Sequence, residues 1–206
     1  TAVGMEALEA NTTGIYNTAV GFRALEAVTS GERNTAVGRQ ALWKNTGAKN
    51  TAVGMNCLEQ NTSGNYNTAI GSNALKNNTT ADNNVAVGYD SLDQCTTGTQ
   101  NNALGVNALG ACTTGAYNTA IGTNALMANQ TNSFNTAIGT NALMVCVGDS
   151  NTAVGAYCLD DNTDGTKNTG MGYNCMPNLT TGDFNVAIGA DAMVSISTGG
   201  NNTALG

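Results

Sequence analysis

Residues 118–122 read Asn-Thr-Ala-Ile-Gly, and residues 135–139 repeat the same five residues. Variants of this motif recur along all 206 residues, and the glycine that closes each copy returns thirteen times between Gly4 and Gly206. Ten of the steps between these glycines are seventeen residues long and two are sixteen. A short and regular period is typical of a solenoid, in which each repeat forms one coil stacked on the last. We therefore expect residues 1–206 to form a single array of about twelve coils.

The two shorter steps locate a turn. Both lose one residue at the same place, where Asn45-Thr46-Gly47 and Cys146-Val147-Gly148 replace a four-residue stretch such as residues 11–14. Deletions are tolerated in turns far better than in strands. This stretch is therefore predicted to be a turn in every coil.

Two apolar columns predict the strands. β-branched and other apolar residues precede the closing glycine, and an Ala-Leu pair follows it by three and four residues. Short apolar segments bounded by Asn and Gly favour strands, and recurrent Gly and Asn disfavour helix. The sequence predicts an all-β fold, a parallel β-roll solenoid of 17-residue coils with two short strands per coil. The predicted core and interface residues are Val3, Leu8, Val20, Leu25, Val37, Leu42, Ile70, Leu75, Ile121, Leu126, Ile138 and Leu143.

The adjacent apolar pairs predict self-association. Successive side chains of a strand point to opposite faces, so Ala2 and Val3 cannot both enter one core, and neither can Ala7 and Leu8. A soluble monomer does not usually expose a long apolar strip. We therefore expect a homo-oligomer in which other copies of the chain cover the outer face.

An Asn precedes the strand motif in every complete repeat, from Asn17 to Asn202. Stacked Asn side chains can form amide ladders along a fibre axis and can satisfy the backbone groups of turns. The Thr that follows this Asn is replaced by Val at Val85 and Val186, which indicates a partly buried position.

Composition excludes several classes of function. The formal charge is −7, and no basic patch exists to displace the counterions of nucleic acid. No apolar run approaches the roughly 18 residues that span a bilayer. No His is present, the acidic residues are scattered, and no nucleophile is paired with a base. We predict no enzyme activity, no cofactor, no metal site, no nucleic-acid partner and no membrane span in this segment.

The six cysteines fall into two columns of small or apolar residues. Free Cys packs as a small hydrophobe, so buried thiols are expected. Cys95 and Cys112 lie in neighbouring coils, as do Cys158 and Cys175, and each pair is close enough for a disulfide to be considered.

Aromatic residues occupy variable positions, mostly just before the Asn column. They can stack on sugar rings of a ligand, or they can simply cover the turn of the next coil. The candidate ligand-facing residues are Tyr16, Trp43, Tyr66, Tyr117, Phe134 and Phe184.

Asn-Thr-Ala-Ile-Gly followed by Asn-Ala-Leu, at residues 118–126 and 135–143, resembles the head repeats of YadA-like trimeric autotransporter adhesins. It is equally similar to repeats of related phage tail fibres and bacterial surface fibres. The repeat is longer here than the family's best-known head repeat, with the extra length in the Thr-Thr-Gly turn. The resemblance implies a homotrimeric rod outside the cell or on a virion, which mediates attachment to a cell-surface glycan or protein receptor.

Two other functions remain open. The array begins and ends within the motif, so we expect a segment of a longer fibre or a self-assembling extracellular filament whose ends pair coil to coil. Ice binding through the regular Thr column is the third hypothesis. Its second Thr column, at Thr12-Thr13 and equivalent positions, falls in a predicted turn.

Overall fold

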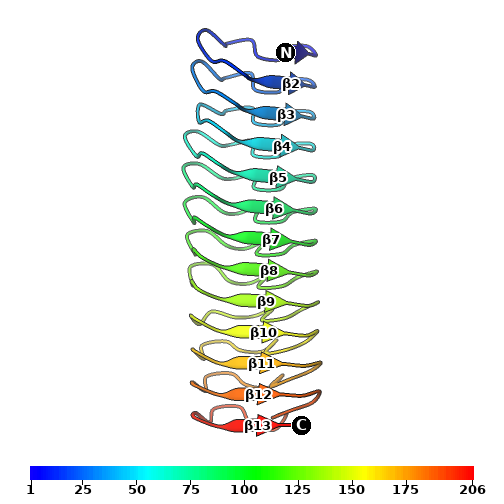
Figure 1. Cartoon of the computed structure of the whole chain (residues 1–206), viewed down its shortest axis with the longest axis vertical. Helices are drawn as coiled ribbons and strands as arrows, with labels where there is room; N and C mark the ends of the chain where they lie inside the picture. Colours follow the sequence, from blue (N-terminus) through cyan, green and yellow to red (C-terminus); the bar gives the residue numbers. More distant parts are fainter.

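A computed structural model describes all 206 residues as one straight stack of coils (Figure 1). Each coil contributes one strand to a thirteen-stranded sheet in which every strand pairs in parallel with the next along the chain. The chain has no helix, and so none that could span a membrane. The strands are β1 (Ala2–Val3), β2 (Thr18–Val20), β3 (Thr35–Val37), β4 (Thr51–Val53), β5 (Thr68–Ile70), β6 (Val85–Val87), β7 (Asn102–Leu104), β8 (Thr119–Ile121), β9 (Thr136–Ile138), β10 (Thr152–Val154), β11 (Thr169–Met171), β12 (Val186–Ile188) and β13 (Thr203–Leu205).

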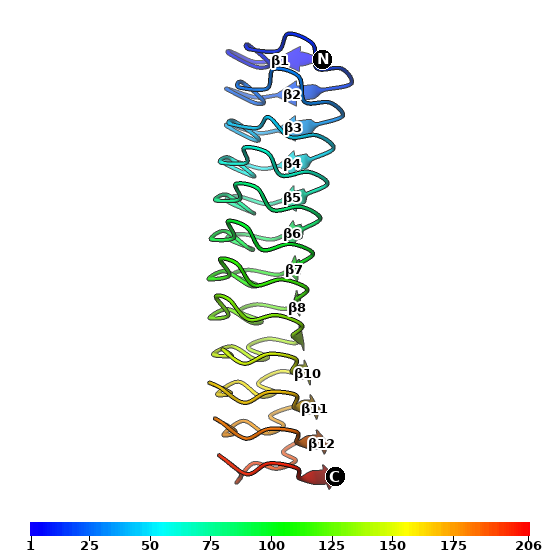
Figure 2. The same ribbon diagram turned by 90° about the vertical axis from the view of Figure 1, so that its left-hand side faces the viewer.

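The register joins identical positions of successive repeats. Ala120 pairs with Ala137 and Ile121 with Ile138, so each column of the sequence becomes a line of side chains along the rod. The first and last strands lie at opposite ends of the rod (Figures 1 and 2). The expected all-β parallel solenoid of about twelve coils with a 17-residue period is confirmed.

The prediction of two strands per coil is wrong, because the Ala-Leu segment forms a turn. The second residue of this pair, Leu in ten coils and Met176 or Met193 in the last two, is left-handed throughout, with φ of 52° at Leu25 and 51° at Leu126. Side chains alternate between two faces only on an extended backbone. In the left-handed turn, Ala24 and Leu25 both point inward and are fully buried. The inference that such a pair cannot share one core is therefore wrong for this segment.

The core is a narrow column of small residues and leucines. The middle residue of each three-residue strand is Ala, or Gly170 in β11, and it points inward to meet the Leu or Met of the turn. Among the leucines predicted as core or interface, those fully buried are Leu25, Leu42, Leu75, Leu126 and Leu143, whereas Leu8 of the first coil is partly buried.

The closing glycines have a backbone that other residues rarely adopt. At Gly122 φ is +131°, and a Cβ added there would lie 2.5 Å from the carbonyl oxygen of Gly139 in the next coil. Glycine is required both by its positive φ and by the close approach of neighbouring coils.

The Asn column joins each coil to the next, as predicted. The Oδ1 of Asn168 accepts a hydrogen bond from the backbone N–H of Asn185 at 2.9 Å. Its Nδ2 donates to the carbonyl oxygen of Gly182 at 2.7 Å. The same arrangement recurs along the rod, and nearly all of these Asn side chains are fully buried. The column therefore satisfies backbone groups that the turns leave unpaired.

Candidate functional site

The outer face of the sheet is the most extended candidate surface, and we call it the strand face. It consists of the first and third residues of each strand, which point away from the buried Ala. The last residue of every strand is apolar. Where this side chain is exposed in the inner coils, its exposed fraction lies between 36% at Val20 and 48% at Leu104. The predicted core and interface residues Val3, Val20, Val37, Ile70, Ile121 and Ile138 lie on this face.

The strand face carries no charge. None of the thirteen strands contains Asp, Glu, Lys or Arg, although the chain has 21 such residues in other columns. The first residue of most strands is Thr, and nearly all of these Thr residues are partly buried. The replacement of Thr by Val186 in the same column had indicated such a position. The residue after the closing glycine is exposed and apolar in several coils, as at Met55, Tyr89 and Val106, and is Arg39 in another.

Five of the six aromatic candidates lie in one column at the tip of the turn before the strand, and we call it the aromatic column. Tyr16, Tyr66, Tyr117, Phe134 and Phe184 are all exposed and all have a left-handed backbone. The rings of Tyr117 and Phe134 stack with centroids 5.0 Å apart and planes at 6°.

Cations cover the other rings of the aromatic column. Arg33 lies over Tyr16, Lys49 over Tyr66 and Lys167 over Phe184, at 5.5, 4.6 and 4.8 Å from the ring centroids. Each ring thus has one face against a side chain of the neighbouring coil, as expected if the ring covers the next turn. All five side chains nevertheless remain exposed. The hydroxyl of Tyr66 accepts a hydrogen bond from the Nζ of Lys49 at 2.6 Å.

The sixth aromatic candidate, Trp43, lies apart from the aromatic column and is partly buried. Its Nε1 donates to the carboxylate of Glu26 at 2.8 Å. The side chains of Arg23 and Lys44 lie over its ring. The indole therefore makes its polar and cation contacts with residues of the same chain.

All six cysteines are buried free thiols. Burial raises the pKa of Cys57 and of Cys158 to about 12, and that of Cys146 to about 11. A thiol held in its protonated form is a poor nucleophile. The pKa of Cys95 is lowered by a hydrogen bond from Cys112. All six side chains lie in the hydrophobic core, in agreement with the buried thiols expected from the sequence.

Near the N-terminus, carboxylate oxygens of Glu6, Glu9 and Glu26 lie within 4.8 Å of one another. The Nε of Arg23 lies 2.5 Å from Glu6 and 3.3 Å from Glu26. The guanidinium thus compensates one of the three negative charges of this cluster.

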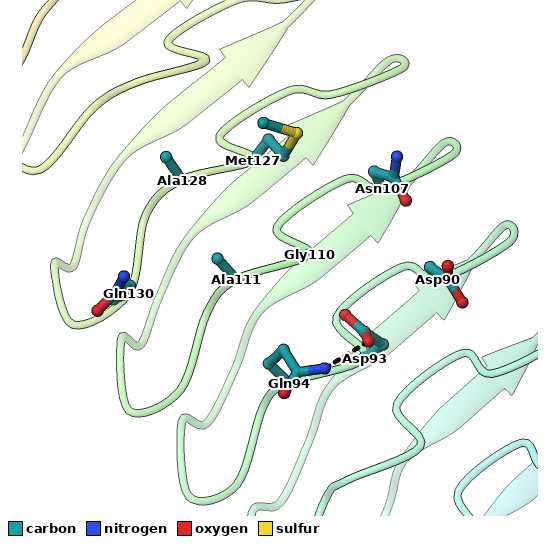
Figure 3. Close-up of a pocket in the computed structure, with 9 residues that line it drawn as sticks. All are labelled: Asp90, Asp93, Gln94, Asn107, Gly110, Ala111, Met127, Ala128 and Gln130. Atoms are coloured by element: carbon teal, nitrogen blue, oxygen red, sulfur yellow. Dashed lines mark hydrogen bonds between the residues drawn. The ribbon is translucent and has the colours of Figure 1, made fainter.

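A groove lined by residues outside the strands was missed by the sequence analysis. We call it the Gly110 groove (Figure 3). Its volume is about 440 Å³. Gly110 leaves a gap in a column that has Asp93 in the preceding coil and Met127 in the following one. The only signal in the sequence was this single glycine among larger side chains. The lining residues are Asp90, Asp93, Gln94, Asn107, Gly110, Ala111, Met127, Ala128 and Gln130.

The two ends of the Gly110 groove differ in chemistry (Figure 3). Asp90 and Asp93 lie on one coil, and the Nε2 of Gln94 donates to Asp93 at 2.6 Å. Burial, and to a smaller extent the charge of Asp90, raise the pKa of Asp93. Two coils further on, Met127 and Ala128 form an apolar end, and the coil between contributes Asn107, Gly110 and Ala111.

Comparisons of the chain with protein-family models, with curated proteins and with solved structures give no match. The class that the structure defines is a parallel β-solenoid of about twelve coils.

Proposed function

We propose that the chain is a segment of a homotrimeric extracellular fibre that projects from a bacterial surface or a virion and mediates attachment. The observation that carries this proposal is the strand face, which is uncharged and has an exposed apolar column along the whole rod. Three chains that pack along this face remove its apolar columns from water.

The size of the strand face supports an association between chains. Thirteen strands of two or three residues, spaced about 4.8 Å apart, make a face about 58 Å long and about 10 Å wide, or on the order of 600 Å². The largest apolar patch of a typical monomer is about 300–600 Å² and often functional. A face of this extent without one charge is typical of an interface core, from which charged residues are depleted.

The number of chains and the attachment role rest on the resemblance of residues 118–126 and 135–143 to YadA-like adhesin heads and related fibre repeats. The net charge of −7 is compatible with such a rod, because it limits association through the charged columns outside the strand face. A receptor, whether a glycan or a protein, would meet those outer columns, which include the exposed side chains of the aromatic column.

Light scattering coupled to size exclusion tests the assembly. We expect a mass three times the chain mass of 20.8 kDa. Ile121→Lys places a charge in the middle of the strand face and is expected to give monomers that keep the circular dichroism of the wild type. Thr114→Lys, in an exposed turn, is the matched control and should stay trimeric. A monomeric wild type, or a trimer that Ile121→Lys leaves intact, would contradict the proposal. A mass that grows without limit would indicate a filament instead.

Ice binding is a second candidate on the same surface. The Thr and apolar columns project side by side from one parallel sheet, so hydroxyl and methyl groups recur at every coil. This differs from the sequence-based expectation, which sought a second Thr column in the turn. Thermal hysteresis measured on a monomeric wild type, and lost in Thr136→Lys, would favour ice binding over the fibre.

A further inference from the structure

The Gly110 groove has a lining that selects for a particular ligand chemistry. Two carboxylates, Asp90 and Asp93, are among its nine lining residues, and no Lys or Arg is. The groove therefore carries a net negative charge at one end, which Lys76 of the preceding coil offsets only in part. No aromatic ring lines it, so it offers no platform on which the face of a pyranose could stack.

The shape of the groove favours a narrow and unbranched ligand. Asp93, Gly110 and Met127 occupy equivalent positions of three successive coils, so the Cα atoms of Asp93 and Met127 are about 10 Å apart. The side chains at both ends narrow this span, and the floor at Gly110 has no side chain at all. A methylene chain fits such a slot, with its carbons against Ala111 and Met127.

We propose that the Gly110 groove binds a primary ammonium group on an unbranched aliphatic stem, the chemistry of a lysine side chain on a partner protein. The ammonium lies at the carboxylates of Asp90 and Asp93, and the stem lies over Gly110 towards Met127. An ammonium has three donors and no acceptor, which matches two carboxylates that have only one amide donor each within the chain.

Two carboxylates alone are a poor site for a hard divalent cation, which takes six or more oxygen ligands. A lysine side chain needs fewer oxygen ligands, because its stem contributes apolar contact while its charged end stays partly hydrated. The groove lies away from the strand face, since its residues come from the turn columns. The inference therefore holds for a single rod as well as for an assembled fibre.

Methyl NMR of the full chain labelled at the methionine methyl groups tests this site. Met127 lies in the groove, whereas Met144 occupies the same column one coil further on and serves as an internal reference. The probe is n-butylammonium chloride, and 1-butanol is its neutral counterpart. We expect a saturable shift of the Met127 methyl with the ammonium, an affinity about tenfold lower for the alcohol, and weaker binding as salt is added.

Matched variants separate this site from general attraction to an acidic protein. Asp93→Asn removes one charge with little change in shape and should weaken binding about fivefold. Asp160→Asn, in the same column of a remote coil without a glycine gap, should leave it unchanged. Gly110→Met should abolish binding by filling the groove. That variant is expected to fold, because a Cβ at Gly110 meets no atom closer than 3.3 Å.

Three results would overturn the inference. They are a Met127 methyl that does not respond to n-butylammonium at up to about 50 mM, equal responses to the ammonium and the alcohol, and unchanged binding in Gly110→Met. Binding of glucosamine as tight as that of n-butylammonium would contradict the unbranched stem.

Discussion

The Asn column makes a quantitative prediction about how coils are held together. Asn168 is fully buried, and its amide is the hydrogen-bond partner of two backbone groups in the next coil, the N–H of Asn185 and the carbonyl of Gly182. Asn168→Ala leaves both without these partners. A buried backbone group without a partner costs about 1–3 kcal/mol, so the variant should lose about 2–6 kcal/mol of stability.

Asn102→Ala is the matched control. Asn102 stands in the Thr column of β7, is exposed, and forms no hydrogen bond through its side chain. Its replacement should change the free energy of unfolding by less than about 0.5 kcal/mol. The two variants remove the same amide group, so the difference between them isolates the buried hydrogen bonds.

Both variants are compared in the Ile121→Lys background, in which the strand face that holds Asn102 is expected to stay in solvent. Urea unfolding there measures the free energies, and native-state hydrogen exchange locates the loss. In a solenoid each coil contacts only its neighbours, so we expect the backbone amide of Asn185 to lose protection while amides of coils near β2 keep theirs. Asn168→Ala that costs no more than Asn102→Ala, or that leaves exchange at Asn185 unchanged, would refute the reasoning.

Three further predictions concern the interior of the rod. Gly122→Ala should destabilise the fold by more than about 2 kcal/mol in thermal unfolding, because its Cβ would lie 2.5 Å from the carbonyl oxygen of Gly139 and φ is +131°; a neutral effect would contradict the close approach of the coils. The double variant Cys95→Asn/Cys112→Asn should stabilise the protein by about 1 kcal/mol in urea, because it continues the amide ladder from Asn78 to Asn129. The buried Oδ1 of Asn78, which has no partner, then gains a donor, as Asn61 has in Asn78 at 2.7 Å; an unstable variant would count against this ladder. Burial raises the pKa of Cys57 from 9.0 to about 12, so on raising the pH the unfolded state releases the thiol proton before the folded state does. The contribution of this thiol to the free energy of unfolding should therefore be complete below about pH 9 and be lost as the pH rises to about 12. Cys57→Ala, which restores the common residue of that column, should lack this part of the alkaline decline in stability.

Much of the architecture followed from residue spacing. The recurrence of Gly122 and Gly139 predicted coils of seventeen residues, and the apolar residue before each glycine predicted the strand. The buried Asn column was also predicted, because Asn at every coil has few uses other than stacking and capping turns. These features are local or strictly periodic, so one repeat contains the information for all.

The course of the chain between the strands was not predicted. Ala24-Leu25 looks like a piece of strand, yet Leu25 has φ of 52° and both side chains are buried. A signal was present two residues after the glycine, where Asn56, Asn73 and Asn107 occupy a left-handed position that Asn tolerates well. A Leu in the left-handed region is unusual, and burial of its side chain in the core offsets the backbone cost.

The sequence alone therefore determined the repeat, the coil length, the position of the strand and the residues that link coils, because each depends on residues within one period. Tertiary structure decided which apolar columns are buried and which stay exposed, since left-handed residues reverse the alternation that an extended chain would show. Tertiary structure also forms the Gly110 groove, in which Asp93 lies at the acidic end, Gly110 in the middle and Met127 at the apolar end. These three residues are seventeen positions apart along the chain and become neighbours only when the coils are stacked.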